Sequence, residues 1–333
     1  MNTPTVLTAR ATPRSEAPAQ PRCAPPWRAP AIVLAAGALA CLLLPDQLGL
    51  LTRIFIAALL VLSLDLVVGI AGLATLGHAA LFGVGAYAAG IFALKVMPDP
   101  LLGLAVGVAA GAALALASGA FLLRYQGFTF LMLTVAVAQI VLSLAQKARD
   151  WTGADDGLSG FAVAPLLGRF AFDLEGRVAA WYALAVLVLA LYLLSRLMNS
   201  PFGLAVRGIH ENRARMAALG TPIYGRLLAM YTVAGAVAGA AGALSAQTNA
   251  VVGLDSLSFA LSAEVLVMLI LGGAGRLYGA VIGTVVFTLL HHTAASINPY
   301  HWLFVVGFLL MGVVLLPPAR VAAFLRRRLG GPR

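Results

Sequence analysis

Long apolar stretches, separated by short polar segments, run along almost the whole chain. A stretch of about 20 apolar residues is long enough to cross a bilayer as a helix. The pattern predicts spans at 30–45, 50–70, 73–95, 101–123, 127–147, 179–198, 226–247, 259–273, 277–293 and 302–317. We therefore expect an all-α polytopic integral membrane protein with about 8–10 transmembrane helices and glycine-rich broken segments.

Two glycine-rich places interrupt these spans. The break at 70–73 is too tight for a plain helical hairpin in lipid, and a run of glycines from Gly272 to Gly283 interrupts the last third of the chain. Irregular backbone survives at membrane depth only where protein or a water-filled cavity covers it. Both breaks are therefore expected in the interior. On a later span, Gly235 and Gly239 have the spacing of a close helix–helix contact.

Composition agrees with a membrane protein, because hydrophobic residues make up 61% and charged residues 10% of the chain. The net charge of +10 could suggest nucleic acid, but the basic residues lie between spans and at the ends. Arginines outnumber acids in the amino tail, in the loop 196–226 and in the carboxyl tail, whereas acids outnumber arginines in the loop 149–177. The positive-inside rule places the first three in the cytoplasm and the last outside.

The predicted organisation has three parts. Residues 1–29 are rich in Pro, Ala and Arg and are expected to form a disordered cytoplasmic tail. Residues 30–318 form the transmembrane domain, with an outer loop at 149–177 and a cytoplasmic loop at 199–225, and residues 319–333 form a basic cytoplasmic tail. A cleaved signal peptide is the alternative for the start, because residues 31–44 have the length of a signal h-region. Cys23 and Cys41 give no disulfide framework.

The polar segment 199–222 carries helix signals at both ends. Ser200 can cap a first turn, and Pro201 at the first helical position loses no hydrogen bond. Gly220 can adopt the left-handed capping conformation, after which Pro222 cannot continue a helix. The segment Glu211–Leu219 between them is too short to be stable alone, since isolated helices below about 12–15 residues are marginal in water. We interpret it as a docking helix for a cytoplasmic protein.

This segment resembles the cytoplasmic signature loop of LivM-type permease subunits of branched-chain amino-acid ABC importers. The matching pieces are Ser200-Pro-Phe-Gly203, Arg207-x-Ile-x-Glu211-Asn212 and Ala217-x-Leu-Gly220. Two further motifs are similar to the same family: Gly69-x-Ala-Gly72-Leu-x-x-Leu-Gly77-His78-Ala79, with Phe82-Gly83-x-Gly85-Ala86-Tyr87 after it, and Glu264-x-x-x-Met268-x-x-Leu271-Gly272-Gly273-x-Gly275-x-x-x-Gly279. The resemblance covers roughly residues 50–317.

The resemblance implies a permease subunit that forms the translocation path for leucine, isoleucine or valine in the bacterial inner membrane. Its implied partners are a second, LivH-type permease subunit, two cytoplasmic ATPase subunits and a periplasmic amino-acid-binding protein. Coupling to the ATPases is expected at Ser200, Pro201, Phe202, Gly203, Arg207, Glu211, Asn212, Ala217, Leu219 and Gly220. The path and its helix breaks are expected at Gly72, Gly77, His78, Glu264, Gly272, Gly273 and Gly275.

The chain carries no Gly-Lys-Ser/Thr of a Walker A motif, so ATP and Mg are expected on the partner ATPases and no cofactor on this chain. Neither a Ser/His/Asp or Cys/His arrangement nor a metal-ligand spacing occurs on the spans. We therefore expect a transport subunit that is not an enzyme and holds no metal.

Ionisable residues inside spans are costly in lipid, which makes them functional candidates. Asp65 stands where the family usually has Asn, and both structural pairing and a role with substrate or in gating remain open. Arg53 lies too far along the same helix for direct contact with Asp65. Glu264 either pairs or lines the path, and His78 is interpreted as a hydrogen-bonded structural residue. His291 and the adjacent His292 are interpreted as the wet end of a span.

The outer loop contains two adjacent acids between glycines. A solvated turn is one interpretation, and docking of the binding protein is the other, because the family has a similar Thr-Gly-Gly-x-Asp-Gly stretch. The docking candidates are Thr152, Gly153, Asp155, Asp156 and Gly157.

Two alternative functions are retained. Importers of urea or short amides have closely similar permeases. An autonomous ion-coupled secondary transporter would show paired repeats with ion ligands near the membrane midplane, and the sequence contains no convincing repeat of that kind.

Overall fold

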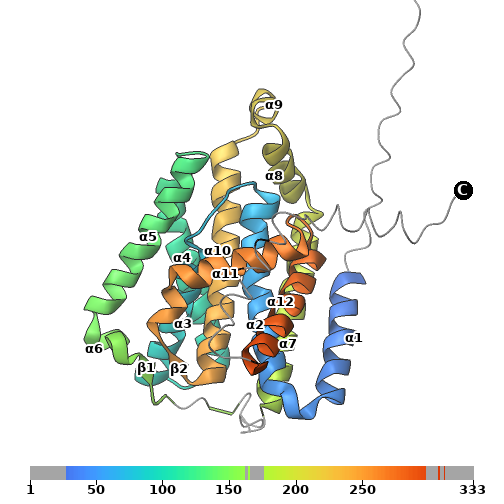
Figure 1. Ribbon diagram of the computed structural model, residues 1–333. Coiled ribbons are helices and arrows are strands. Elements are labelled where there is room, and N and C mark those ends of the chain that lie inside the picture. Colours follow the sequence, from blue (N-terminus) through green and yellow to red (C-terminus); the bar gives the residue numbers. More distant parts are fainter. Residues whose placement is uncertain (1–27, 162–163, 166–175, 298–306, 308–310, 312–333) are drawn as a thin grey trace, which may run out of the picture.

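The computed structural model describes residues 28–161, 164–165 and 176–297, together with Gly307 and Met311. This part of the chain is a bundle of helices (Figure 1), and seven of them are long and apolar enough to cross a membrane. Pro30–Leu43 and Phe259–Gly272 are shorter apolar helices. The predicted all-α polytopic architecture is thereby confirmed. The span expected at 302–317 lies, apart from Gly307 and Met311, outside the described residues, as do residues 1–27 and 319–333.

The helices and strands follow one another in this order: α1 (Arg28–Leu43), η1 (Pro45–Gln47), α2 (Leu48–Asp65), η2 (Leu66–Ile70), α3 (His78–Lys95), α4 (Pro100–Leu122), α5 (Phe128–Lys147), α6 (Arg149–Thr152), η3 (Ala154–Asp156), β1 (Leu158–Ser159), α7 (Arg177–Met198), α8 (Pro201–Glu211), α9 (Arg213–Ala218), α10 (Ile223–Asn249), β2 (Val251–Val252), η4 (Leu254–Leu257), α11 (Phe259–Gly272) and α12 (Leu277–Ile297).

The bundle has two distinct ends (Figure 1). Helices α8 and α9 project from one of them, which we call the α8 end. Strands β1 and β2 lie at the opposite end, where they pair antiparallel with Leu158 opposite Val252 and Ser159 opposite Val251. We call this the sheet end.

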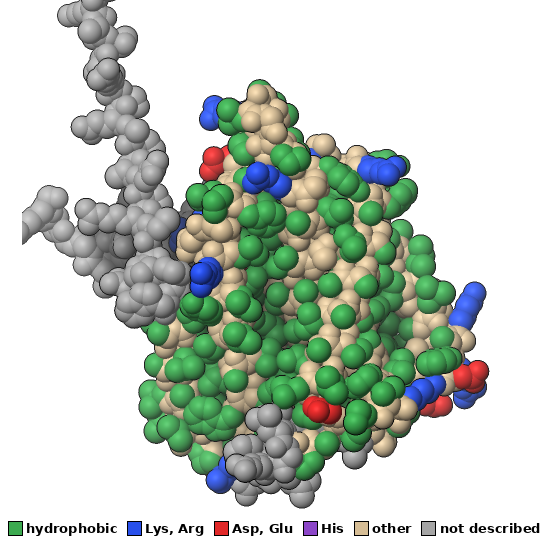
Figure 2. Space-filling model, turned by 180° about the vertical axis from the view of Figure 1, so that it is seen from behind, with side chains coloured by type: hydrophobic (Ala, Val, Ile, Leu, Met, Phe, Trp, Pro, Cys, Tyr) green, Lys and Arg blue, Asp and Glu red, His purple; other side chains and the backbone are tan. Residues whose placement is uncertain are grey.

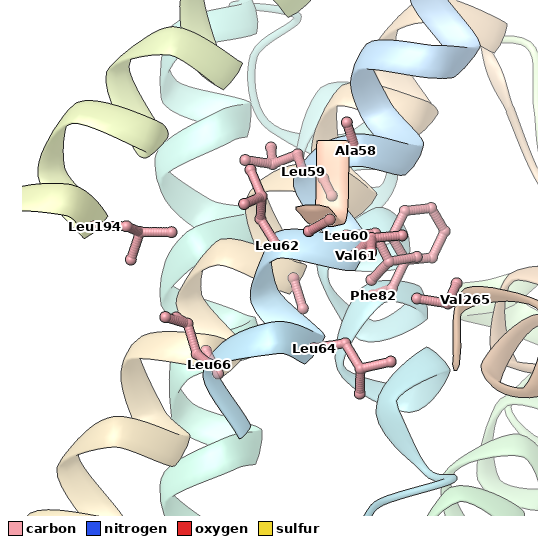
Figure 3. Close-up of a cluster of buried hydrophobic side chains, with 14 of the residues drawn as sticks. Ala58, Leu59, Leu60, Val61, Leu62, Leu64, Leu66, Phe82, Leu194 and Val265 are labelled. Carbon is pink, nitrogen blue, oxygen red and sulfur yellow. The ribbon is translucent and has the colours of Figure 1, made fainter. Parts of the chain in front are cut away.

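Helix α2 forms the centre of the core. It is apolar on all sides, as expected for a helix surrounded by others, and Leu59, Leu62 and Leu64 are completely buried. Figure 3 shows side chains of other helices around it, among them Phe82 of α3, Leu194 of α7 and Val265 of α11. The interior of the bundle is thus built on α2.

Glycines allow α10 to lie unusually close to α4. A Cβ added to Gly235 would lie 2.7 Å from the carbonyl oxygen of Gly111, and one added to Gly111 would lie 2.8 Å from the Cα of Gly239. Such small residues permit the close approach that replaces a hydrophobic drive between helices in lipid. The predicted close contact at Gly235 and Gly239 is confirmed.

Both predicted breaks are present, but they are not wholly interior as expected, since Gly72, Ala74 and Ala274 are exposed. The third span was expected to begin at residue 73, but α3 begins only at His78, because the chain leaves α2 through the π-helix η2 and then runs irregularly through 71–77. Gly72 supports this turn with φ +69°, and the Leu73 N–H donates back to the Val67 carbonyl at 2.9 Å. The second break joins α11 to α12, with Gly273 at φ +88° and Gly275 at φ +83°.

The reverse side of the molecule has the surface of a lipid-facing protein. In Figure 2 hydrophobic side chains cover the middle of this face, while Lys, Arg, Asp and Glu lie nearer its two ends. This distribution fits a bundle that spans an apolar layer.

Candidate functional site

The polar segment 199–222 lies at the α8 end, and its first helix begins where the sequence predicted, at Ser200 and Pro201. The Ser200 hydroxyl accepts from the Gly203 N–H at 3.4 Å, and Pro201 occupies the first turn of α8. Every third residue of α8 then faces inward, so that Gly203, Val206 and Ile209 are buried. Gly220 ends the segment with φ +74°.

The helix expected over Glu211–Leu219 has different bounds in the structure. Glu211 is the last residue of α8, and a second helix, α9, covers only Arg213–Ala218. The reason is Asn212, whose extended backbone ends α8 and whose side chain accepts from the Arg215 N–H at 2.9 Å as the cap of α9. The docking segment is therefore two short helices with a corner at Asn212.

The outer surface of this pair combines apolar and basic side chains. Leu204 is 57% exposed and Leu219 is 72% exposed. Exposure of an apolar side chain to water is unfavourable, so both leucines are candidates for contact with a partner. Arg207, Glu211 and Arg215 are exposed beside them. We call this the α8–α9 surface, defined by Leu204, Arg207, Glu211, Arg215, Ala217 and Leu219.

Helix α8 contacts the first helix break through His210, a residue that is otherwise exposed. A Cβ on Gly72 would lie 2.5 Å from Cδ2 of His210, so the imidazole rests directly on the backbone of this turn. Helix α8 also packs against η2. The sequence alone did not identify His210, because its contact with Gly72, which is distant in the sequence, is visible only in the folded chain.

The two breaks meet at Asp65. Its carboxylate Oδ1 accepts from the Gly275 N–H at 2.6 Å, and this bond joins α2 to the link between α11 and α12. The close approach requires a glycine at position 69, since a Cβ there would collide with Asp65 and with the Gly275 backbone. Arg207 of α8 attracts the same carboxylate electrostatically. Asp65, Arg207, His210, Gly72 and Gly275 thus form one group, which we call the break cluster.

The structure gives Asp65 a partner that the sequence did not indicate, the backbone N–H of Gly275. Asp65 is fully buried near the α8 end, whereas Arg53 is exposed on an earlier turn of α2. The second carboxylate oxygen of Asp65, Oδ2, is buried without a hydrogen-bond partner among the described residues. A buried carboxylate held by one backbone N–H and a nearby cation is sensitive to any movement of that N–H.

His78 is buried at the start of α3, as the structural interpretation expected. Its Nε2 lies 2.7 Å from the Ser63 hydroxyl, which itself donates to the Leu60 carbonyl at 2.6 Å. Because the serine proton is used there, Nε2 is the donor to Ser63. The next residue, Ala79, donates its N–H to the Ser262 hydroxyl at 2.9 Å and so ties α3 to α11.

The remaining candidates near the breaks have packing or pairing roles. Gly77 lies against the backbone of Thr134 on α5. Gly272 lies against Gly279 and allows α11 and α12 to approach closely. Glu264 is half-buried on α11, and His291 of α12 attracts it electrostatically.

The candidate outer loop is a compact turn at the sheet end. Gly153 and Gly157 have φ +74° and +69°, and Asp155 and Asp156 are exposed between them. Thr152 is not a surface contact, since it is 8% exposed and its hydroxyl donates to the Ala145 carbonyl at 2.6 Å. Asp156 pairs with Arg149 at 3.6 Å with both side chains well exposed, so Asp155 is the carboxylate of this turn without such a pair among the described residues.

Metal chemistry has no visible basis in the described residues, where no group of three or more His, Cys, Asp or Glu side chains could hold an ion. The described polar groups are suited to fixing backbone and to contacting partners.

The contact of His210 with Gly72 leads to a prediction. If the chain has the transport role that the resemblance implies, Gly72→Ala is expected to lower the transport rate at least about threefold, because the methyl group meets the imidazole and because alanine at positive φ costs roughly 1 kcal/mol. Adding His210→Ala should restore part of the loss, since it removes the collision but not the strain. Transport assays on the two single variants and the double variant measure the energetic coupling between Gly72 and His210. Additive effects of the two substitutions would show that the two residues are not coupled.

Comparison with known proteins agrees with these observations. The family model described as branched-chain amino acid transport system / permease component matches residues 47–314. The high-affinity branched-chain amino acid transport system permease proteins LivM of Salmonella typhimurium and Escherichia coli are 29% and 28% identical over 297 residues, covering 81% of this chain and 68% of each relative. A probable branched-chain amino acid transport permease protein LivM of Methanocaldococcus jannaschii is 25% identical over 242 residues, covering 68% of this chain and 65% of the relative. No solved structure matches.

The family match covers both helix breaks and the α8–α9 surface, the features that the structure brings together. With a helical bundle of at least seven candidate spans, the chain is a multi-pass membrane protein, and it belongs to the family of permease components of branched-chain amino acid transport systems.

Proposed function

We propose that this chain is the membrane permease subunit of an ATP-binding-cassette importer, and that separate ATPase subunits drive it from the α8–α9 surface. The observation that carries the proposal is the construction of that surface. Leu204 near the start of α8 and Leu219 just after α9 are exposed on a segment that also carries exposed arginines, while α8 contacts a helix break through His210 and Gly72. An anchor of this kind suits the groove of a partner protein.

The charges support an orientation with the α8 end in the cytoplasm. Arginines gather there, and Glu211 is the exposed acid among them. Acids such as Asp155 and Asp156 gather at the sheet end. By the positive-inside rule the sheet end then faces the outside of the plasma membrane, with both chain termini in the cytoplasm. For a bacterial cell this is the inner membrane.

The energetic link is differential binding. An ATPase pair that holds the α8–α9 surface differently with and without ATP shifts the permease between two conformations, whereas equal affinity would shift nothing. Movement of α8 is passed at Gly72 to the irregular stretch that follows η2, and it reaches the α11–α12 link through Asp65 at the end of α2 and Gly275. ATP and Mg belong to the partner ATPases in this scheme.

The substrate and its delivery complete the proposal. The named relatives support branched-chain amino acids as the substrate class. At the sheet end, Asp155 and Asp156 on their rigid glycine turn offer a docking site for a soluble binding protein that brings the substrate. We place the translocation path beside the two breaks, because irregular backbone survives at membrane depth where protein or a water-filled cavity covers it, and Gly72 and Ala274 at the breaks are exposed.

The test is reconstitution of the complete system. Liposomes containing this chain, its companion permease and the two ATPases, with ATP inside and the binding protein outside, are expected to accumulate labelled leucine. Omission of ATP or of the ATPases should stop accumulation. Uptake by this chain alone under an ion gradient, or uptake of urea in place of leucine, would contradict the proposal.

A further inference from the structure

A line of polar side chains follows one face of α5. Gln139, Ser143 and Lys147 are spaced four residues apart, so they lie above one another on the helix. All three are exposed, and with Ile140 and Leu144 they line an open hollow of about 340 Å³. We call these five residues the polar α5 face.

The Gln139 end of this face lies well inside the span that α5 would make across a membrane. Lys147 ends α5 at the sheet end, and Gln139 precedes it by eight residues, or about 12 Å at 1.5 Å per residue. The apolar core of a bilayer is about 30 Å thick, so the Gln139 amide is far from water. No described residue hydrogen-bonds the Gln139 side chain.

Helix α4 provides an internal comparison. Within their apolar windows α4 and α5 are both only 22% buried in the bundle. The outward side chains of α4 are apolar, and the largest of them are Leu101, Leu102, Leu116 and Phe121. Ser118 turns its hydroxyl back to the Leu114 carbonyl at 2.7 Å. Lipid can cover α4 without cost, whereas a free amide on α5 is costly in lipid.

We infer that the polar α5 face is the surface against which the second permease subunit packs. Side-chain amides and hydroxyls that hydrogen-bond across helices hold membrane helices together, and Gln139 and Ser143 present these groups at the required depth. This inference rests on the proposed function, which requires a companion permease.

The charge of Lys147 favours a different chain over a second copy of this one. In a homodimer with its two-fold axis along the membrane normal, both α5 helices would present Lys147 at the same depth, and like charges would face each other. A companion chain with an acceptor at that level avoids the repulsion.

The experiment is site-specific photo-crosslinking in the full complex. A benzophenone amino acid is placed at Ile140 on the polar α5 face or at Leu116 on α4, and the chain is co-expressed with a tagged companion permease and the ATPases. Ile140 is expected to give a product that contains the companion permease, and Leu116 is expected to give none. In wild-type background, Gln139→Leu with Ser143→Ala should lower recovery of the companion permease in mild detergent by about threefold, while Leu116→Ala leaves it unchanged.

Other outcomes overturn the inference. A product of two copies of this chain would identify a homodimer contact, a product within one chain that maps to residues 298–317 would identify an internal neighbour, and lipid adducts alone would identify a lipid-facing surface. Co-purification of the ATPases is measured on the same samples. If the ATPases remain bound while the Ile140 product is missing, only this inference fails; if the wild type retains no ATPase, the proposed function fails.

Discussion

Replacing Leu204 and Leu219 with aspartate is expected to abolish ATP-driven leucine uptake while the chain still folds in the membrane. Both side chains are mainly exposed, so the bundle loses little when they change. In the complex they are the apolar anchors of the α8–α9 surface, and loss of such anchors costs about 2 kcal/mol or more each, or roughly 30-fold in the dissociation constant per residue. The measurement is co-purification of the ATPases with the tagged variant, followed by uptake into liposomes.

A matched control separates docking from a general effect of added charge. Val96→Asp with Met97→Asp makes the same chemical change at two exposed apolar residues beyond the end of α3, away from the α8–α9 surface. This control should retain the ATPases. If the Leu204 and Leu219 variant also retains both ATPases and uptake, the α8–α9 surface is not their docking site.

Asp65→Leu is expected to lower uptake more than tenfold without releasing the ATPases. The leucine cannot accept from the Gly275 N–H, so the link between α2 and the α11–α12 break is lost. An unsatisfied buried N–H costs about 1–3 kcal/mol, but removal of a buried charge offsets part of that cost. The fold should therefore survive while movement of α8 no longer reaches α11 and α12.

Asp65→Asn distinguishes the hydrogen bond from the charge. The asparagine carbonyl can still accept from Gly275, although the attraction from Arg207 is lost. We expect it to keep at least about half of the wild-type uptake, because the hydrogen bond from Gly275 is retained. ATP hydrolysis and uptake are measured together: Asp65→Leu should hydrolyse ATP without matched transport. Wild-type uptake in Asp65→Leu would show that the bond to Gly275 has no role in coupling.

Local signals made much of the architecture predictable from the sequence. Each span is a continuous apolar stretch, and a segment of sufficient length must satisfy its backbone within a helix in lipid. The start at Ser200 and Pro201 and the end at Gly220 are determined by capping chemistry within a few residues. The breaks could be located because glycines tolerate backbone conformations that other residues do not.

Contacts between distant segments required the tertiary structure. Asp65 lies 210 residues from its partner Gly275, and the partner is a backbone N–H, which leaves no mark in the sequence. Similarly, His210 carried no signal of its own until the fold placed it on Gly72. Thr152 looked like part of a docking loop, yet the loop turns its hydroxyl inward to Ala145.

By itself, then, the sequence determined that the chain consists of long apolar helices, where those helices break, and where the helical part of the polar segment 199–222 begins and ends, because those properties depend on length, periodicity and caps within a few turns. Only the tertiary structure showed that α8 contacts the first break through His210 and Gly72, and that Asp65 is bonded to the second break at Gly275. Such contacts depend on how whole helices pack. The same holds for α5, whose polar residues became informative only when the fold left them facing outward.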